Sequence, residues 1–369
     1  MQFSDFPGQD SAINLLKGML AADRLPHALL FVGPEGCGKL GVALSLAQSV
    51  LCPNVDEDFN ACGTCNQCIK SKKLQHPDLH FSFPYVGKDY RSDDFVKEWK
   101  EAVLENPYLN YDLWSNILKV ENKQGNIYKS ECVNIIKKLS FKRYEGAKKI
   151  MVIWMAEFLG TEGNRLLKLI EEPPEDTQFI LIAENTEKVL NTILSRCQLI
   201  KFNKISDIAL STYLASKYGM NEERAKEVAF FSNGNMLDAL SGIEQVGKGE
   251  FDLFIDWLRK AYQGKPVDLV KKAEEIATLG KDAIKQVFSY GLQFLAEINR
   301  LKILGAKHSR LNGKTLDSAE KLKNLLDLKA IEQMQQLLDE SSYHLERNAN
   351  AKLLILNMGI QMNAIFRMR

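Results

Sequence analysis

A glycine-rich stretch near the start of the chain has the residue types and spacing of a phosphate-binding loop. In the stretch FVGPEGCGKLGVAL, Gly33, Gly38 and Lys39 fit the pattern G-x-x-x-x-G-K. Glycines in such a loop let backbone N–H groups surround a phosphate, and the lysine reaches the outer phosphates. Leu40 stands where these loops carry Ser or Thr, whose hydroxyl holds the Mg²⁺ of a bound nucleotide. The spacing therefore predicts a degenerate nucleotide-binding loop, made by Gly33, Gly36, Gly38 and Lys39, and leaves ATP binding in doubt.

Two interpretations of this loop remain open from the sequence. Its ring of backbone N–H groups at the start of a helix could hold a sulfate, a phosphate or a weakly bound nucleotide. Alternatively, the loop is kept because it packs the junction between a strand and a helix. We favour the second interpretation.

Four of the seven cysteines lie close together, with the spacing C-x9-C-x2-C-x2-C: Cys52, Cys62, Cys65 and Cys68. Four thiolates close a tetrahedral zinc site and leave no position for water, so such a site is structural. The spacing predicts a structural zinc module; the alternative is four unligated surface thiols. The other three are expected to be ordinary small buried residues: Cys37, Cys132 and Cys197.

The elements that must position these residues alternate between apolar runs and helical patterns. Strands are expected within residues 27–33, 76–84, 150–154, 178–185 and 197–202. Helices are expected at residues 10–22, 38–52, 127–141 and 164–174, the last one ended by two prolines. This alternation predicts an α/β fold, with a doubly wound parallel sheet covered by helices on both faces.

Changes in pattern along the chain predict three domains. The first, at 1–204, is the P-loop-like α/β domain, with the cysteine module at 52–68 and an insertion at 85–126. A small helical domain follows at 205–245, and an all-helical domain at 246–369 begins at the break VGKGE. The aromatic-rich insertion is interpreted either as a partner surface or as an excursion that packs against its own domain.

The net charge and the apolar stretches of the chain indicate which kinds of partner to expect. The chain has 369 residues and a net charge of +1, so no global basic field indicates a protein that binds nucleic acid alone. No signal peptide opens the sequence, and no apolar stretch reaches the roughly 20 residues of a membrane span. We therefore expect a cytoplasmic protein without a membrane partner.

Several stretches together resemble the bacterial clamp-loader subunits of DNA polymerase III, which belong to the AAA+ class. They are the P-loop followed by the cysteine module, LLKLIEEPPEDTQFIL at 166–181 and TILSRCQLIKF at 192–202. The likeness covers residues 1–242 apart from the insertion at 85–126. It implies an AAA+ domain with a zinc module, a helical lid domain and an all-α collar domain for oligomerisation. The complex that it implies loads the sliding clamp onto primed DNA, as part of the DNA polymerase III holoenzyme, a DNA-directed DNA polymerase.

This family includes ATP-hydrolysing subunits, gamma and tau, and a non-hydrolysing subunit, delta prime. Leu40 replaces the metal-binding hydroxyl, and Trp154 and Met155 stand where active members carry a metal-anchoring Asp and a catalytic Glu. Glu157 comes two positions late, and Leu237 stands in place of a second sensor arginine. Phosphoryl transfer needs the charge of the metal, an oriented water and positive side chains. The resemblance therefore predicts no intrinsic ATPase activity.

Arg196, in the motif SRC, matches the arginine that the family presents to the ATP site of a neighbouring subunit. A guanidinium there stabilises the charge that develops in the transition state; the alternative is a solvated loop residue. We favour a subunit of the delta prime type. Its implied partners are clamp-loader ATPase subunits, the delta subunit, and the sliding clamp and primed DNA within the complex. A gamma/tau-type ATPase and the clamp-opening delta subunit remain alternatives.

Basic residues are frequent from Lys137 to Lys149. Such a run is most often a solvated face. The corresponding region of clamp loaders lies near the DNA chamber, so the resemblance predicts a weak DNA contact through Lys142 and Arg143.

Overall fold

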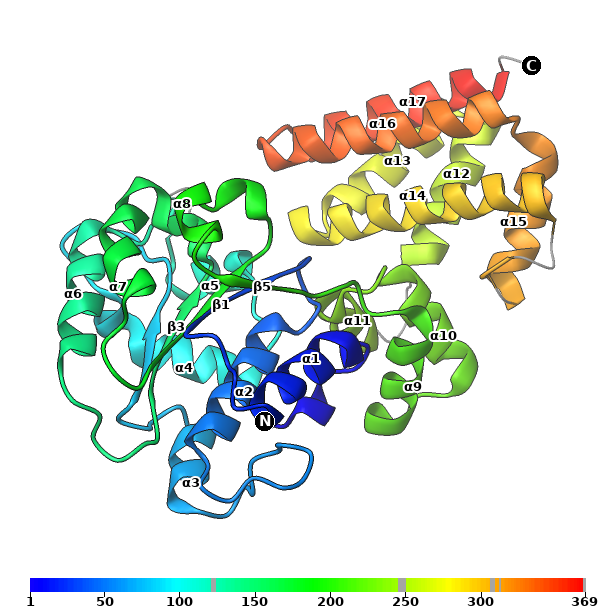
Figure 1. Ribbon diagram of the computed structural model, residues 1–369. Helices are drawn as coiled ribbons and strands as arrows, with labels where there is room; N and C mark the ends of the chain where they lie inside the picture. The colour runs from blue at the N-terminus through cyan, green and yellow to red at the C-terminus, as the bar shows by residue number, and fades with distance from the viewer. Residues whose placement is uncertain (121–123, 245–249, 306–308, 312, 368–369) are drawn as a thin grey trace. The chain divides into compact units, whose positions relative to one another are not determined.

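The computed structural model describes residues 1–120, 124–244, 250–305, 309–311 and 313–367 (Figure 1). The chain divides into two compact units. The first comprises Met1–Tyr213 and Asn233–Leu237, and the second Leu214–Ser232 and Asp238–Arg369. The three predicted domains stay a prediction, and most of the predicted break, residues 246–249, lies outside the described residues.

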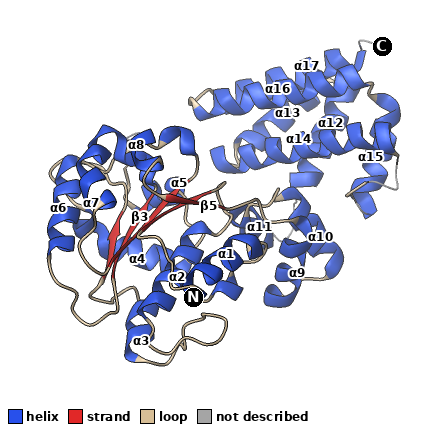
Figure 2. Cartoon of the chain, in the orientation of Figure 1, coloured by secondary structure: helices blue, strands red, loops and turns tan. Residues whose placement is uncertain are grey.

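A five-stranded sheet forms the centre of the first unit (Figure 2). Its order is β2 (Leu79–Ser82), β3 (Lys149–Trp154), β4 (Thr177–Ala183), β1 (Ala28–Val32) and β5 (Gln198–Lys201). Every neighbouring pair is parallel. The predicted strands and the parallel α/β fold class are thus confirmed. Strands buried on both faces need continuous apolar runs, which is why β4 reads FILIA from Phe179.

Helices cover both faces of this sheet. Side chains such as Leu30, Met151 and Leu181 face a core shared with the helices that follow β2 and β3. Their neighbours along the strands face the opposite side, where α2 packs on β1, β3 and β4 (Figure 1). The α-helices of the first unit are α1 (Asp10–Ala21), α2 (Lys39–Leu51), α3 (Asn66–Lys72), α4 (Val96–Glu105), α5 (Tyr111–Ile117), α6 (Lys129–Ser140), α7 (Leu167–Glu171) and α8 (Asn191–Leu194). Its 3₁₀ helices are η1 (Phe3–Asp5), η2 (Ser92–Phe95), η3 (Ala156–Leu166) and η4 (Thr186–Lys188).

The helix predicted at 164–174 is shorter than expected. The chain leaves β3 as the 3₁₀ helix η3, which is kinked at Gly160 (φ 47°, ψ −143°). Only α7 is α-helical, and it ends at Glu171 because the prolines at 173 and 174 follow.

The insertion at 85–126 packs against its own unit over the residues that the structure describes. Trp99 and Trp114 are fully buried, and the Trp99 ring stacks on Phe83 with centroids 4.9 Å apart. The indole Nε1 of Trp114 donates a hydrogen bond of 2.7 Å to the Pro84 carbonyl. Of the two interpretations, the self-packed excursion describes these residues; positions 121–123 lie outside the described part.

Helices make up all the regular structure described in the second unit, as the sequence predicts. They are α10 (Glu222–Phe231), α12 (Glu250–Gln263), α13 (Pro266–Ala277), α14 (Lys281–Leu304), α15 (Gly313–Leu325), α16 (Leu328–Glu346) and α17 (Ala351–Arg367). Two further helices begin in the first unit and end in the second: α9 (Asp207–Tyr218) and α11 (Met236–Glu244). The core of the second unit is rich in aromatic side chains, among them Phe254, Trp257, Phe288 and Phe294.

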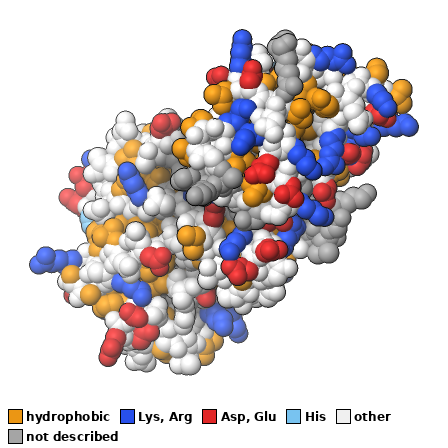
Figure 3. Space-filling model, turned by 90° about the vertical axis from the view of Figure 1, so that its right-hand side faces the viewer, with side chains coloured by type: hydrophobic (Ala, Val, Ile, Leu, Met, Phe, Trp, Pro, Cys, Tyr) orange, Lys and Arg blue, Asp and Glu red, His pale blue; other side chains and the backbone are white. Residues whose placement is uncertain are grey.

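Charged side chains of both signs are interspersed on the face drawn in Figure 3, in accord with the net charge of +1. Within the described residues, none of the helices combines the length and the apolarity that a membrane-spanning segment requires.

Candidate functional site

The predicted phosphate-binding loop lies between β1 and α2. Gly36 and Gly38 adopt positive φ angles of 66° and 93°, where glycine is favoured because it has no Cβ. Gly38 caps the start of α2. A Cβ on Gly36 would lie only 1.6 Å from Oδ1 of Asn235, so the loop is tightly covered at this point.

Lys39 is folded back into its own loop. The side chain is buried, and its Nζ donates hydrogen bonds of 2.6 Å to the Gly33 carbonyl and 2.7 Å to the Pro34 carbonyl. These two loop carbonyls take the place of a phosphate as acceptors, so the structure supplies partners for the ammonium group without a nucleotide.

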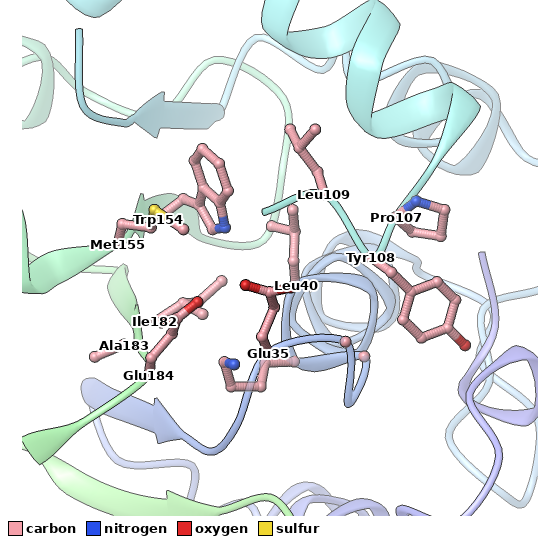
Figure 4. Close-up of a pocket in the computed structure, with 13 residues that line it drawn as sticks. Glu35, Leu40, Pro107, Tyr108, Leu109, Trp154, Met155, Ile182, Ala183 and Glu184 are labelled. Carbon is pink, nitrogen blue, oxygen red and sulfur yellow. The ribbon is translucent and has the colours of Figure 1, made fainter. Parts of the chain in front are cut away.

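The space above the loop is almost filled. The cavity there has a volume of about 30 Å³, which suits a water molecule, whereas small-molecule pockets measure roughly 300–1,000 Å³. Leu40, Leu109 and Trp154 point into this region, with Glu35 and Glu184 beside them (Figure 4).

The insertion and the segment 233–237 both hold the loop. Glu35 Oε1 accepts hydrogen bonds from Asn110 Nδ2 (3.0 Å) and Asn235 Nδ2 (3.5 Å). The Met236 N–H donates to the Gly36 carbonyl at 3.0 Å. Sequence reasoning missed Asn110 because no periodicity marks the insertion. It did single out the segment around Asn235, but only for the missing arginine at Leu237.

Apolar side chains occupy the positions at which the resemblance implies catalytic carboxylates. Trp154 and Met155 both line the cavity, and Met155 has a positive φ of 58°, which is uncommon outside glycine. Glu157 instead lines a neighbouring cavity of about 390 Å³, together with Glu35 and Glu184. Its Oε1 accepts a hydrogen bond of 3.1 Å from the Glu184 N–H, and burial raises the pKa of both carboxyl groups.

The four clustered cysteines come together as predicted, and their ligand atoms all lie within 4.8 Å of one another. The Sγ atoms are 4.0 Å apart for Cys52 and Cys65, and 3.8 Å apart for Cys62 and Cys68. A zinc tetrahedron with Zn–S bonds of about 2.3 Å has sulfur–sulfur edges of about 3.8 Å. The cluster therefore fits a metal ion.

Backbone N–H groups surround these sulfurs. Cys52 Sγ accepts from the N–H groups of Asn54 and Cys62, and Cys62 Sγ accepts from that of Cys65, each at 3.4 Å. Backbone hydrogen bonds, that of Thr64 foremost, lower the pKa of Cys62 to about 6. Burial raises the pKa of Cys68 to about 12. Outside the cluster, Cys37 and Cys132 are buried and Cys197 is half-buried.

Arg196 lies just before β5, at the end of the sheet opposite to the loop. Its Nε donates to Glu171 Oε2 at 3.1 Å, and its Nη1 donates to the Thr192 carbonyl at 2.9 Å. Because β5 and β1 are parallel, the length of β1, about 16 Å for five residues, separates Arg196 from Gly33. Arg196 therefore lies about one strand length from the loop of its own chain.

The basic run from 137 to 149 divides into buried and exposed parts. Lys149 is buried and donates to the Leu139 and Phe141 carbonyls. Lys142 and Arg143 are exposed, and Arg143 Nε lies 3.3 Å from Asp176 Oδ2. The run is thus only partly the solvated face that such runs usually form.

Known proteins resemble this chain over half of its length or more. A family model described as "DNA polymerase III, delta subunit" matches residues 8–206. DNA polymerase III subunit delta' of Bacillus subtilis is 30% identical over 207 residues, which cover 56% of this chain and 51% of that protein. DNA polymerase III subunit tau of the same organism is 25% identical over 308 residues, which cover 78% and 48%. The chain spans about half the length of these two curated relatives.

Solved structures to which this chain shows similarity include a DNA clamp loader delta protein of Bacillus subtilis and a gamma-subunit-related protein of DNA polymerase III from Thermotoga maritima. The first has a TM-score of 0.35 at 10% identity and covers 96% of this chain and 99% of that chain. The second has a TM-score of 0.42 at 13% identity and covers 95% and 99%.

Proposed function

Because the chain belongs to the family described as DNA polymerase III, delta subunit, we propose that it acts as a clamp-loader subunit of the delta prime type. Such a subunit assembles with clamp-loader ATPase subunits and the delta subunit, and helps to load the sliding clamp onto primed DNA. It does not hydrolyse ATP itself. Its contribution to hydrolysis is Arg196, which it presents to the ATP site of a neighbouring subunit.

The filled cavity above the loop is the observation that carries this proposal. The cavity directly above the loop, about 30 Å³, is far smaller than the roughly 300–1,000 Å³ of small-molecule pockets, and Leu40 lines it where a metal-binding hydroxyl would be needed. Lys39 is hydrogen-bonded to its own loop. These features support a loop kept for packing and an absence of intrinsic ATPase activity.

The setting of Arg196 supports a role toward another chain. Its ion pair with Glu171 and its bond to the Thr192 carbonyl limit the conformations of a long side chain. An arginine already held in place loses less conformational entropy when it meets a γ-phosphate. Its position, one strand length from its own loop, favours an ATP site in a neighbouring subunit.

The remaining assignments follow the same proposal. Zinc held by the four cysteines would be structural, since four thiolates leave no open position. Residues 205–245 would form the lid domain, and the helices after residue 246 the collar through which subunits assemble. Lys142 and Arg143 would make a weak contact with DNA.

A gamma/tau-type ATPase is the second candidate, because tau and gamma subunits are also among the relatives. Measurement of ATP turnover by the isolated chain, with Mg²⁺ and primed DNA, separates the two. We expect no turnover above the background of a Lys39→Ala variant. Hydrolysis that Lys39→Ala abolishes would contradict the proposal and favour the second candidate. The clamp-opening delta subunit is a further alternative, and metal analysis tests it. Delta subunits generally lack the zinc module, so one zinc per chain would argue against this alternative.

A further inference from the structure

The cysteine module adjoins an exposed loop that lies more than 70 positions later in the sequence. Helix α3 begins inside the module, since Cys65 caps the helix and its Sγ accepts a hydrogen bond of 3.4 Å from the Cys68 N–H. The exposed loop comprises residues 141–147 between α6 and β3, and we call it the basic loop. The two segments are joined by polar contacts and by packing.

Helix α3 contacts the basic loop directly through Glu145. Lys70 Nζ forms an ion pair with this carboxylate, at 2.6 Å from Oε1 and 2.9 Å from Oε2. Gln67 Nε2 donates to the Glu145 carbonyl at 3.4 Å. Because Gln67 and Lys70 are three residues apart, both lie on one face of the helix. These polar contacts therefore tie Glu145 to α3.

The carboxylate of Asp78 holds the basic loop through hydrogen bonds from three of its backbone N–H groups. Its Oδ1 accepts from the Tyr144 N–H at 2.6 Å, and its Oδ2 accepts from the Glu145 and Gly146 N–H groups at 2.8 and 2.7 Å. Buried His76 accepts at Nδ1 from the Asp78 N–H, and its Nε2 is hydrogen-bonded to Gln67 Oε1. Gln67 thus joins α3 to this second anchor as well.

At Gly146, the basic loop packs closely against the end of α2 and against His76. A Cβ on Gly146 would lie 2.6 Å from Leu51 Cδ2 and 3.1 Å from His76 Cε1. Leu51 directly precedes Cys52, the first cysteine of the module. Both ends of the module, the end of α2 and helix α3, therefore meet the basic loop.

The outer part of this loop presents aromatic and cationic side chains together. Phe141 and Tyr144 are 61% and 80% exposed, and they flank the exposed Lys142 and Arg143. Exposed rings on which bases stack, combined with cations that meet phosphates, are how proteins bind single-stranded nucleic acid without sequence preference. This combination fits single-stranded DNA.

We propose that the metal-loaded cysteine module positions the basic loop for contact with single-stranded DNA. Without the metal, α3 loses the anchors that Cys65 and Cys68 provide, and the Lys70–Glu145 ion pair then no longer fixes the loop. The choice of DNA as the partner rests on the proposed function; the coupling between module and loop rests on the contacts alone.

Amide hydrogen exchange of the full chain tests the coupling. After a chelator removes zinc, we expect the amides of Tyr144, Glu145 and Gly146 to exchange at least about tenfold faster, because their hydrogen bonds to Asp78 open more often. The amides of β4 serve as the reference and are expected to stay protected. Unchanged exchange at residues 144–146 would overturn the proposal.

A variant that leaves the cysteines intact gives a second test. Lys70→Met removes the ion pair but keeps the apolar stem, and it should accelerate exchange at the same three amides with zinc still bound. Lys73→Met, at an exposed position just after α3, is the matched control and should have no effect. Equal exchange in the two variants would contradict a link through Lys70.

Binding of a fluorescent oligothymidylate to the full chain tests whether single-stranded DNA is the partner of the basic loop. We expect zinc removal, Lys70→Met and Tyr144→Ala each to weaken binding severalfold, while Lys73→Met does not. Faster exchange with unchanged binding in all three cases would refute DNA as the partner of the loop. Neither readout depends on ATP turnover, so failure here is distinguishable from failure of the delta prime assignment.

Discussion

Three apolar side chains occupy positions where the resemblance to clamp-loader subunits implies the catalytic groups of an ATPase. Leu40, Trp154 and Met155 are all apolar and all line one small cavity. Each replaces a group that would hold a metal or activate water with one that fills space. The result is a well-packed junction between β1 and α2, in which Lys39 is satisfied by loop carbonyls.

Arg196 offers the most direct test at the residue scale. In a complex reconstituted with ATPase partner subunits, Arg196→Ala should lower ATP turnover by about 10³-fold, because a transition-state charge loses its counter-charge. Assembly, followed by size-exclusion chromatography, should be unaffected. Arg165→Ala, which removes a surface ion pair with Glu162, is the matched control. Equal ATP turnover in the two variants would contradict a role for Arg196 at the ATP site of a neighbouring subunit.

The carboxyl group of Asp78 should make the free energy of unfolding depend on pH. Burial acts to raise its pKa, but three backbone N–H donors outweigh burial and hold the pKa below its usual value. Because the unfolded value is about 3.9, the stabilisation is fully present at neutral pH and is lost as the pH falls from about 4 through the folded pKa. Asp78→Asn should therefore cost about 1–3 kcal/mol at neutral pH.

Urea unfolding at neutral pH and near pH 3 measures this effect. The difference in unfolding free energy between wild type and Asp78→Asn should shrink at the lower pH. A difference that stays constant would mean that the carboxylate charge contributes nothing to the hydrogen bonds that hold the basic loop.

Short elements depend on their surroundings, and α3 is the clearest case. It has seven residues, and isolated helices shorter than roughly 12–15 residues are marginal in water. Cys65 caps this helix and Cys68 lies in its first turn. A metal ion held by the four sulfurs would therefore stabilise α3 by cross-linking it to the rest of the module.

Metal removal tests this element. We expect one zinc per chain by elemental analysis, and chelation should lower the thermal midpoint because metal-binding energy stabilises the folded module. Cys65→Ser should lower the zinc content in the same way, whereas Cys132→Ser, at a buried cysteine outside the module, should retain it. A chain that contains no zinc and is indifferent to chelation would contradict a structural metal.

Charge balance matters at the scale of the whole molecule. With a net charge of +1, the isolated chain has no global basic field that would attract nucleic acid, and both signs of charge are interspersed on the face drawn in Figure 3. Any contact with DNA must then come from a local group such as Lys142 and Arg143.

The dependence of DNA affinity on salt concentration tests how many phosphate contacts Lys142 and Arg143 supply. If these two side chains supply the phosphate contacts, the logarithm of the affinity for an oligothymidylate should fall with the logarithm of salt concentration with a slope of about −1.4. The double variant Lys142→Ala/Arg143→Ala should bring the slope close to zero. A slope several times steeper in the wild type would indicate a different and larger basic surface.

Much of the fold was predictable from the sequence because the signals are local. Buried parallel strands are continuous apolar runs, and the glycine spacing between an apolar run and a helical pattern indicates the loop between β1 and α2. The four cysteines lie within 17 positions, so their convergence follows from short-range geometry. The start of α7 was less predictable, since the apolar pattern from residue 164 suits a 3₁₀ helix as well as an α-helix.

The sequence by itself determined that the loop lacks a metal ligand and that four thiols meet. Only the tertiary structure decided that Asn110 and Asn235 meet at Glu35, that Glu171 holds Arg196, and that Asp78 holds the loop after Phe141. These pairs are separated by 25 to 200 positions along the chain. No local pattern encodes them, because contacts between distant segments depend on how helices and loops pack once the sheet has formed.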